Sequence, residues 1–167
     1  MAHALRKEPL SFVGTAPKRW TFEAPVAAPR EQVFAAISAD PKTWTWFPGI
    51  SSGSRYHGDG PHGVGSIREA RMGPAVYRET ILAWDAPNVW AYRVDEMTVP
   101  LANALVEEWR IDPAPGGSVV RWTFAIDPRP LFIASGPLAP RAMGRLFRSA
   151  MRNLSETLAG SASLEAG

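Results

Sequence analysis

The chain has 167 residues, the length of one domain with room for a buried core. Its formal net charge of +2, with a pI near 9.3, is too small a bias to indicate a nucleic-acid partner. The absence of cysteine excludes disulfides and thiolate chemistry, and no apolar run approaches the roughly 20 residues that a membrane span needs. The start of the chain lacks a signal-peptide pattern, so we expect a cytoplasmic protein.

The first third of the chain predicts an arm, a strand and two short helical segments. Residues 1–18 contain prolines and a glycine without any apolar period, which indicates a loose N-terminal arm. Residues 19–24 alternate between polar and apolar side chains, as a strand does. A helix is predicted to begin at Pro29 and to stop before Asp40, and a second helical turn is expected over 42–50.

The middle of the chain is a succession of strands separated by turn residues. The connections after residue 72 are too short for helical crossovers, so those strands are expected to run antiparallel. The expected strands are 53–57, 65–72, 76–84, 89–95, 104–112 and 118–126.

The last element is an amphipathic helix predicted over residues 137–159. Its apolar positions, among them Met143 and Phe147, lie opposite four arginines. Gly160 stands where a helix often ends, so residues 161–167 are expected to form a flexible tail. The folded domain would then cover residues 19–160.

The four arginines of that helix admit two interpretations. They are spaced to form one stripe, which would suit phosphates or an acidic membrane surface. The same pattern is typical of any solvated helix face, and that is the interpretation we favour. The chain contains no recognisable nucleic-acid-binding module. The arginines in question are Arg141, Arg145, Arg148 and Arg152.

These elements predict an α+β fold in which seven antiparallel strands curve around the last helix. A long meander with one apolar face must be covered, and one helix with one apolar stripe is available. Such a sheet often leaves part of its interior unfilled. Strand alternation places three groups on the covered face: Trp90, Tyr92 and Val94; Leu105, Glu107, Trp109 and Ile111; and Val120, Trp122, Phe124 and Ile126.

Several short motifs, in order along the chain, carry a resemblance to a known family. They are Pro29-x-Glu31-x-Val33-Phe34-x-x-Ile37, the Trp44/Trp46 pair, Gly63-Val64-Gly65, Trp84-Asp85-x-Pro87 before Tyr92-Arg93, and Glu108-Trp109-Arg110 before Gly116-Gly117. Over residues 19–159 the chain resembles the polyketide cyclase/dehydrase-like branch of the START-like (SRPBCC) superfamily. The resemblance implies the helix-grip fold and a hydrophobic ligand held between sheet and helix. Some members of the superfamily cyclise polyketides.

Ten residues are candidates for ligand binding. Core packing is the alternative for the aromatic residues between 90 and 124 and for Met143 and Phe147. Glu107 interrupts an apolar face and is the one catalytic candidate. The alternative is that its side chain reaches solvent at the end of the strand or is turned outward by a bulge. The mixed patterns of the strands 65–72 and 76–84 do not fix which of Arg68, Tyr77, Arg78 and Glu79 point inward. The candidates are Arg68, Tyr77, Trp90, Tyr92, Glu107, Trp109, Trp122, Phe124, Met143 and Phe147.

Two motifs are rejected on context. Residues 58–63 spell G-x-G-x-x-G, but a strand follows, whereas a dinucleotide loop must open a helix. His57, Asp59 and His62 are metal-ligand types in a glycine-rich loop that offers no further ligand. We therefore expect neither a cofactor nor a metal ion.

The leading functional hypothesis is a module that encloses a hydrophobic, aromatic or polyketide-like small molecule, with no nucleic-acid partner. The alternative is a cyclase or dehydratase in which Glu107 removes a proton next to a carbonyl, with Tyr77, Tyr92 or Arg68 as the donor to the enolate. A third reading is an interaction domain with a filled interior.

Overall fold

One antiparallel sheet is the centre of the computed structural model, which describes residues 2–165 and the side chains of residues 2–161. Seven strands follow the order β2-β8-β7-β6-β5-β4-β3, and the two-residue strand β1 (His3–Ala4) pairs with β6. The seven strands are β2 (Lys18–Val26), β3 (Arg55–Tyr56), β4 (Ile67–Met72), β5 (Ala75–Asp85), β6 (Val89–Met97), β7 (Ala102–Ala114) and β8 (Gly117–Pro128).

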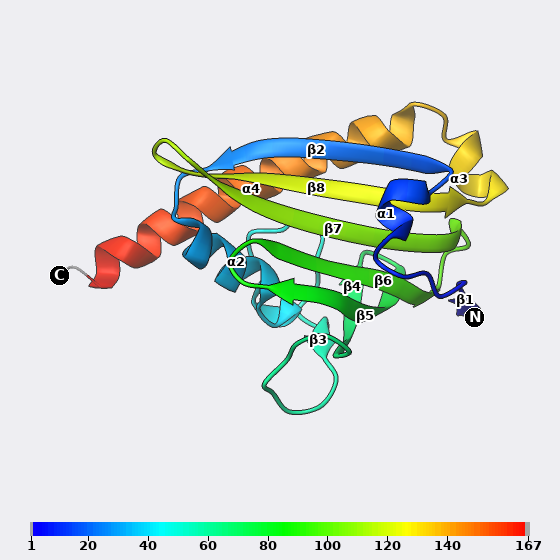
Figure 1. Cartoon of the computed structure of the whole chain (residues 1–167), viewed down its shortest axis with the longest axis horizontal. Helices are drawn as coiled ribbons and strands as arrows, with labels where there is room; N and C mark the ends of the chain where they lie inside the picture. The colour runs from blue at the N-terminus through cyan, green and yellow to red at the C-terminus, as the bar shows by residue number, and fades with distance from the viewer. Residues whose placement is uncertain (1, 166–167) are drawn as a thin grey trace.

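The helices complete the helix-grip architecture that the sequence predicted, and β1 is an addition to it. Figure 1 shows the longest helix running along β2 over much of the length of the sheet. The helical segments are α1 (Phe12–Thr15), α2 (Arg30–Ser38), the 3-10 turn η1 (Pro41–Thr43), α3 (Pro130–Ala134) and α4 (Leu138–Glu165).

Helix α4 packs by its apolar stripe, as predicted, because Phe147, Met151 and Leu154 are completely buried. Its predicted end at Gly160 is wrong. The helix continues to Glu165, because an exposed glycine inside a helix costs only about 1 kcal/mol and the following alanine, serine, leucine and glutamate tolerate the helix. Residues 161–165 of the expected tail are therefore helical, and residues 166–167 lie outside the described residues.

The N-terminal arm is packed on the sheet, which corrects the expectation that it is loose. The backbone N–H of Leu5 donates to Asp95 O, and Leu5 itself is buried. Phe12 of α1 is buried against Val106 and Ala125, on the face of the sheet opposite α4. Two apolar side chains in a segment without periodicity are enough to fix it, and a search for periodicity cannot detect them.

The alternation of β6, β7 and β8 is confirmed, because the three predicted groups are buried on the α4 side. Strand β5 does not alternate regularly. Its pairing with β6 shifts between Arg78 and Glu79 and again between Ile81 and Ala83. Ile81 therefore belongs to the inner core, Leu82 packs on the outer face, and Trp84 returns to the inner core. These bulges explain why the sequence pattern did not fix the orientation of β5 side chains.

Candidate functional site

A cavity of about 380 Å³ lies between the inner face of the sheet and the helices α3 and α4. This volume is in the range of small-molecule pockets. Most of the lining side chains are aliphatic or aromatic. The lining also includes the exposed residues Leu131 and Ala142, so the cavity reaches the surface beside α3 and the first turns of α4.

Eight of the ten predicted site residues line the cavity, and two do not. Trp90 and Phe147 are completely buried and belong to the core. The Trp90 ring packs 4.9 Å from Tyr92, and Phe147 packs 5.8 Å from Trp122. Alternation predicts on which side of a sheet a residue lies but not how deep the cavity reaches. The eight lining residues are Arg68, Tyr77, Tyr92, Glu107, Trp109, Trp122, Phe124 and Met143.

Glu107 is an inward carboxyl group in the middle of β7. It stands opposite Tyr92 in the β6–β7 pairing, and its Oε2 accepts hydrogen bonds from Tyr92 Oη at 2.5 Å and Trp122 Nε1 at 2.8 Å. Its other oxygen, Oε1, has no hydrogen-bond partner among the described residues, and Glu107 lines the cavity. Glu107 is therefore held in place through one oxygen while the other is available to a guest.

Burial raises the pKa of Glu107 from 4.5 to about 7, and the negative charge of Glu79 adds to this rise. The hydrogen bonds from Tyr92 and Trp122, together with the charge of Arg68, oppose it. Near neutral pH the carboxyl group therefore exists in both protonation states. Such a group can accept a proton from a bound molecule or donate one to it.

Arg68 and Glu79 form a buried ion pair across β4 and β5, where they stand directly opposite each other. Glu79 Oε2 accepts from Arg68 Nε at 2.6 Å and from Nη2 at 2.5 Å. The guanidinium carbon lies 4.9 Å from the Trp44 ring centroid and 4.6 Å from those of Trp90 and Tyr92. These ring faces stabilise the buried cation, although Arg68 Nη1 has no hydrogen-bond partner.

Tyr77 is the remaining polar group on β5 that faces the cavity. Burial, together with the negative charges of Glu107 and Glu79, raises the pKa of Tyr77 to about 12, so the phenol stays protonated at neutral pH. Its hydroxyl has no hydrogen-bond partner among the described residues. Of the three donors expected beside Glu107, Tyr92 contacts it, Arg68 is held by Glu79, and Tyr77 is free to contact a guest.

The structure also adds site residues that the sequence did not assign. Glu79 points inward with Arg68, whereas Arg78 is exposed. Trp44 reaches the cavity from the segment after η1, where no periodicity marks an inward side chain. The cluster of Trp44, Trp46 and Phe47 was the available signal, because aromatic side chains at such density seldom stay in solvent.

The histidines of the β3–β4 loop do not line the cavity. The β3–β4 loop extends away from the sheet (Figure 1), and His62 stacks on Tyr56 at 4.2 Å. Among residues 2–165 no group of three or more His, Cys, Asp or Glu side chains is placed to hold a metal ion. None of the described helices combines the length and the apolar character needed to cross a bilayer.

Comparison with known proteins agrees with this fold. An uncharacterized protein from Mycobacterium tuberculosis is 29% identical over 148 residues, which are 86% of this chain and 88% of that protein. A START superfamily protein from Mycobacterium smegmatis has the same fold, with a TM-score of 0.64 at 14% identity over 83% of this chain and 95% of that one. Major latex-like protein 151 from Panax ginseng gives a TM-score of 0.66 at 13% identity over 84% and 96% of the two chains.

A family model, described as polyketide cyclase / dehydrase and lipid transport, matches residues 19–159. This match includes every strand from β3 to β8, nearly all of β2, and most of α4. Family and fold together suggest a protein that binds a hydrophobic ligand. The chain belongs to the polyketide cyclase / dehydrase and lipid transport family.

Proposed function

We propose that this protein encloses a hydrophobic small molecule, of aromatic or polyketide-like type, in the cavity between the sheet and α4. The observation that supports this most strongly is the cavity of about 380 Å³ with its largely apolar lining. Glu107 and Tyr77 each offer an oxygen that has no hydrogen-bond partner among the described residues. A guest would be held mainly by apolar burial and oriented by these two groups.

Binding is tested by isothermal titration with a fatty acid and with a flavonoid as probes. We expect one-to-one binding of at least one probe and loss of that binding in Ala142→Trp, which fills the mouth of the cavity with an indole. Ala134→Trp is the matched control, because Ala134 is an exposed helical alanine that does not line the cavity. No binding of either probe, or equal binding by both variants, would argue against the proposal.

Catalysis on a carbonyl substrate is a second candidate, favoured by the raised pKa of Glu107. In this reaction Glu107 takes the proton from the carbon next to a carbonyl group, the carbon–hydrogen electron pair forms the enolate, and the Tyr77 hydroxyl donates a hydrogen bond to the enolate oxygen. Proton–deuterium exchange of a 1,3-diketone, followed by NMR, measures this step.

Glu107→Gln separates the two functions because it keeps the shape and removes the base. If the protein is an enzyme, the exchange is abolished and affinity is largely retained. If it is a binder, wild-type exchange stays at the buffer rate and affinity changes by about 1–3 kcal/mol, as expected for one buried polar contact.

A further inference from the structure

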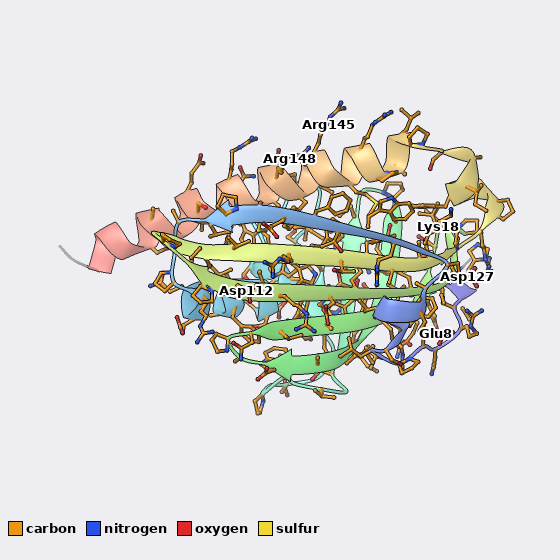
Figure 2. The ribbon with its side chains drawn as sticks, turned by 45° about the horizontal axis from the view of Figure 1, so that its top comes forward. Glu8, Lys18, Asp112, Asp127, Arg145 and Arg148 are labelled. Carbon is orange, nitrogen blue, oxygen red and sulfur yellow. The ribbon has the colours of Figure 1, made fainter. Side chains whose placement is uncertain are left out.

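The four arginines of α4 differ from most other arginines of the chain in having no acidic partner. All four are exposed, and among the described residues none forms an ion pair. Figure 2 shows Arg145 projecting away from the body of the protein. The first acidic residue of α4 is Glu156. By contrast, seven arginines elsewhere each pair with a carboxylate: Arg6, Arg30, Arg68, Arg71, Arg93, Arg110 and Arg121.

These four arginines decide the sign of the net charge. The formal net charge of the chain is +2, so the chain without these four arginines would carry −2. The net positive charge of the chain therefore depends on one helix face. An unpaired basic strip of this kind attracts anionic surfaces.

Most of the exposed large apolar side chains lie near the N-terminal end of α4, where the row of arginines begins. Four large hydrophobic residues are exposed among the described side chains, and three of them lie in α3 and at the start of α4. Their exposed fractions are 53% for Leu131, 60% for Ile133 and 69% for Leu138. Val64, in the β3–β4 loop, is the fourth.

Helix geometry places Leu138 on the same face as the arginines. Arg141, Arg145 and Arg148 follow Leu138 by three, seven and ten residues, and side chains at these spacings share one side of an α-helix. A surface groove between α4 and β2 runs along the arginines, and its lining includes Trp20, Phe22, Arg141, Arg145 and Arg148. The cavity opens at this end through Leu131 and Ala142.

We propose that this α3–α4 surface, made of Leu131, Ile133, Leu138, Arg141, Arg145 and Arg148, docks on an anionic lipid bilayer. The arginines contact lipid phosphates, and the leucine and isoleucine side chains enter the boundary of the acyl chains. A nucleic acid would satisfy the arginines but would offer no apolar phase to the three aliphatic side chains. Docking in this orientation turns the mouth of the cavity towards the bilayer.

Co-sedimentation with vesicles tests this proposal, using phosphatidylcholine alone or with about one third phosphatidylglycerol. We expect binding to the anionic vesicles only, and release near 1 M salt, where the Debye length is about 3 Å. The double variant Arg145→Gln/Arg148→Gln should bind at least about tenfold more weakly, because each arginine near an anionic surface contributes about fivefold. Ile133→Ser/Leu138→Ser should also weaken binding, by about tenfold.

Arg55→Gln/Arg78→Gln is the matched control, because it removes two exposed positive charges at the far side of the sheet from β2. It should bind within about twofold of the wild type. The proposal would be overturned if Arg55→Gln/Arg78→Gln weakened vesicle binding as much as Arg145→Gln/Arg148→Gln does. It would also be overturned by equal binding to neutral and anionic vesicles, or by binding to soluble RNA without binding to vesicles. Docking through these exposed side chains does not require an occupied cavity, so its test is separate from the test of the function proposed above.

Discussion

Replacing Glu107 by glutamine should stabilise the protein at high pH, although it alters the candidate site. The side chain is only 7% exposed, and burial raises its pKa from 4.5 to about 7. A carboxyl group whose pKa is raised on folding binds its proton more tightly in the folded state. The wild-type free energy of unfolding therefore falls as the pH rises from about 4.5, and it levels off above about 7.

The size of the effect follows from the two pKa values. At about 1.4 kcal/mol for each pH unit between them, ionised Glu107 costs the folded state about 3 kcal/mol at pH 8. Glutamine does not ionise and avoids this cost. Its amide nitrogen takes the place of Oε1, which has no hydrogen-bond partner among the described residues, and the unpaired buried N–H groups take back about 1–2 kcal/mol. The net gain of about 1–2 kcal/mol raises the melting temperature by roughly 2–8 °C for a chain of this length.

Thermal melts at pH 5 and pH 8 measure the difference directly. We expect the melting temperature of Glu107→Gln minus that of the wild type to be several degrees more positive at pH 8 than at pH 5. Glu96→Gln is the control, because Glu96 is an exposed carboxylate on the neighbouring strand β6, and its difference should be the same at both pH values. A Glu107→Gln difference that does not change with pH would refute the reasoning.

Three further predictions concern the surroundings of Glu107. Glu79→Gln should destabilise the fold by about 3–5 kcal/mol in urea unfolding, because it leaves Arg68 buried without a counter-charge, and a simultaneous Arg68→Met should recover most of that loss. Phe147→Ala should cost about 3–5 kcal/mol in the same assay, because the ring is completely buried in the core; a cost below 1 kcal/mol would place it elsewhere. Tyr92→Phe removes a hydrogen bond that lowers the pKa of Glu107, so the NMR titration midpoint of Glu107 should move to higher pH, and a downward move would contradict the contact.

The fold was predictable because its signals are local and periodic. The two-residue period of β6, β7 and β8 places Trp109 and Phe124 on the covered face, and the arginine spacing gives the outer face of α4. The resemblance to the START-like superfamily supplied the arrangement of these elements. Where the period breaks, at the two bulges of β5, the sequence did not say that Tyr77 and Glu79 point inward.

The candidate site was predictable in part, because alternation gives the side of a strand and not the depth of a cavity. Glu107 was identified as an odd carboxyl on an apolar face, but its contact with Trp122 joins two strands diagonally and has no sequence signature. Trp90 and Phe147 lie inward as expected, yet neighbouring rings cover them completely. The pairing of Arg68 with Glu79 depends on the register between β4 and β5, and the amino-acid sequence alone does not determine that register.

Photo-crosslinking tests most directly whether a hydrophobic guest occupies the cavity. A fatty acid that carries a diazirine is irradiated with the protein, and the labelled peptides are identified by mass spectrometry. We predict labels on Met97, Leu105, Phe124 or Met143, which line the cavity on three strands and α4, and loss of these labels with excess unlabelled fatty acid or in Ala142→Trp. Labels confined to the outer face of the sheet, or unaffected by the competitor, would contradict the account.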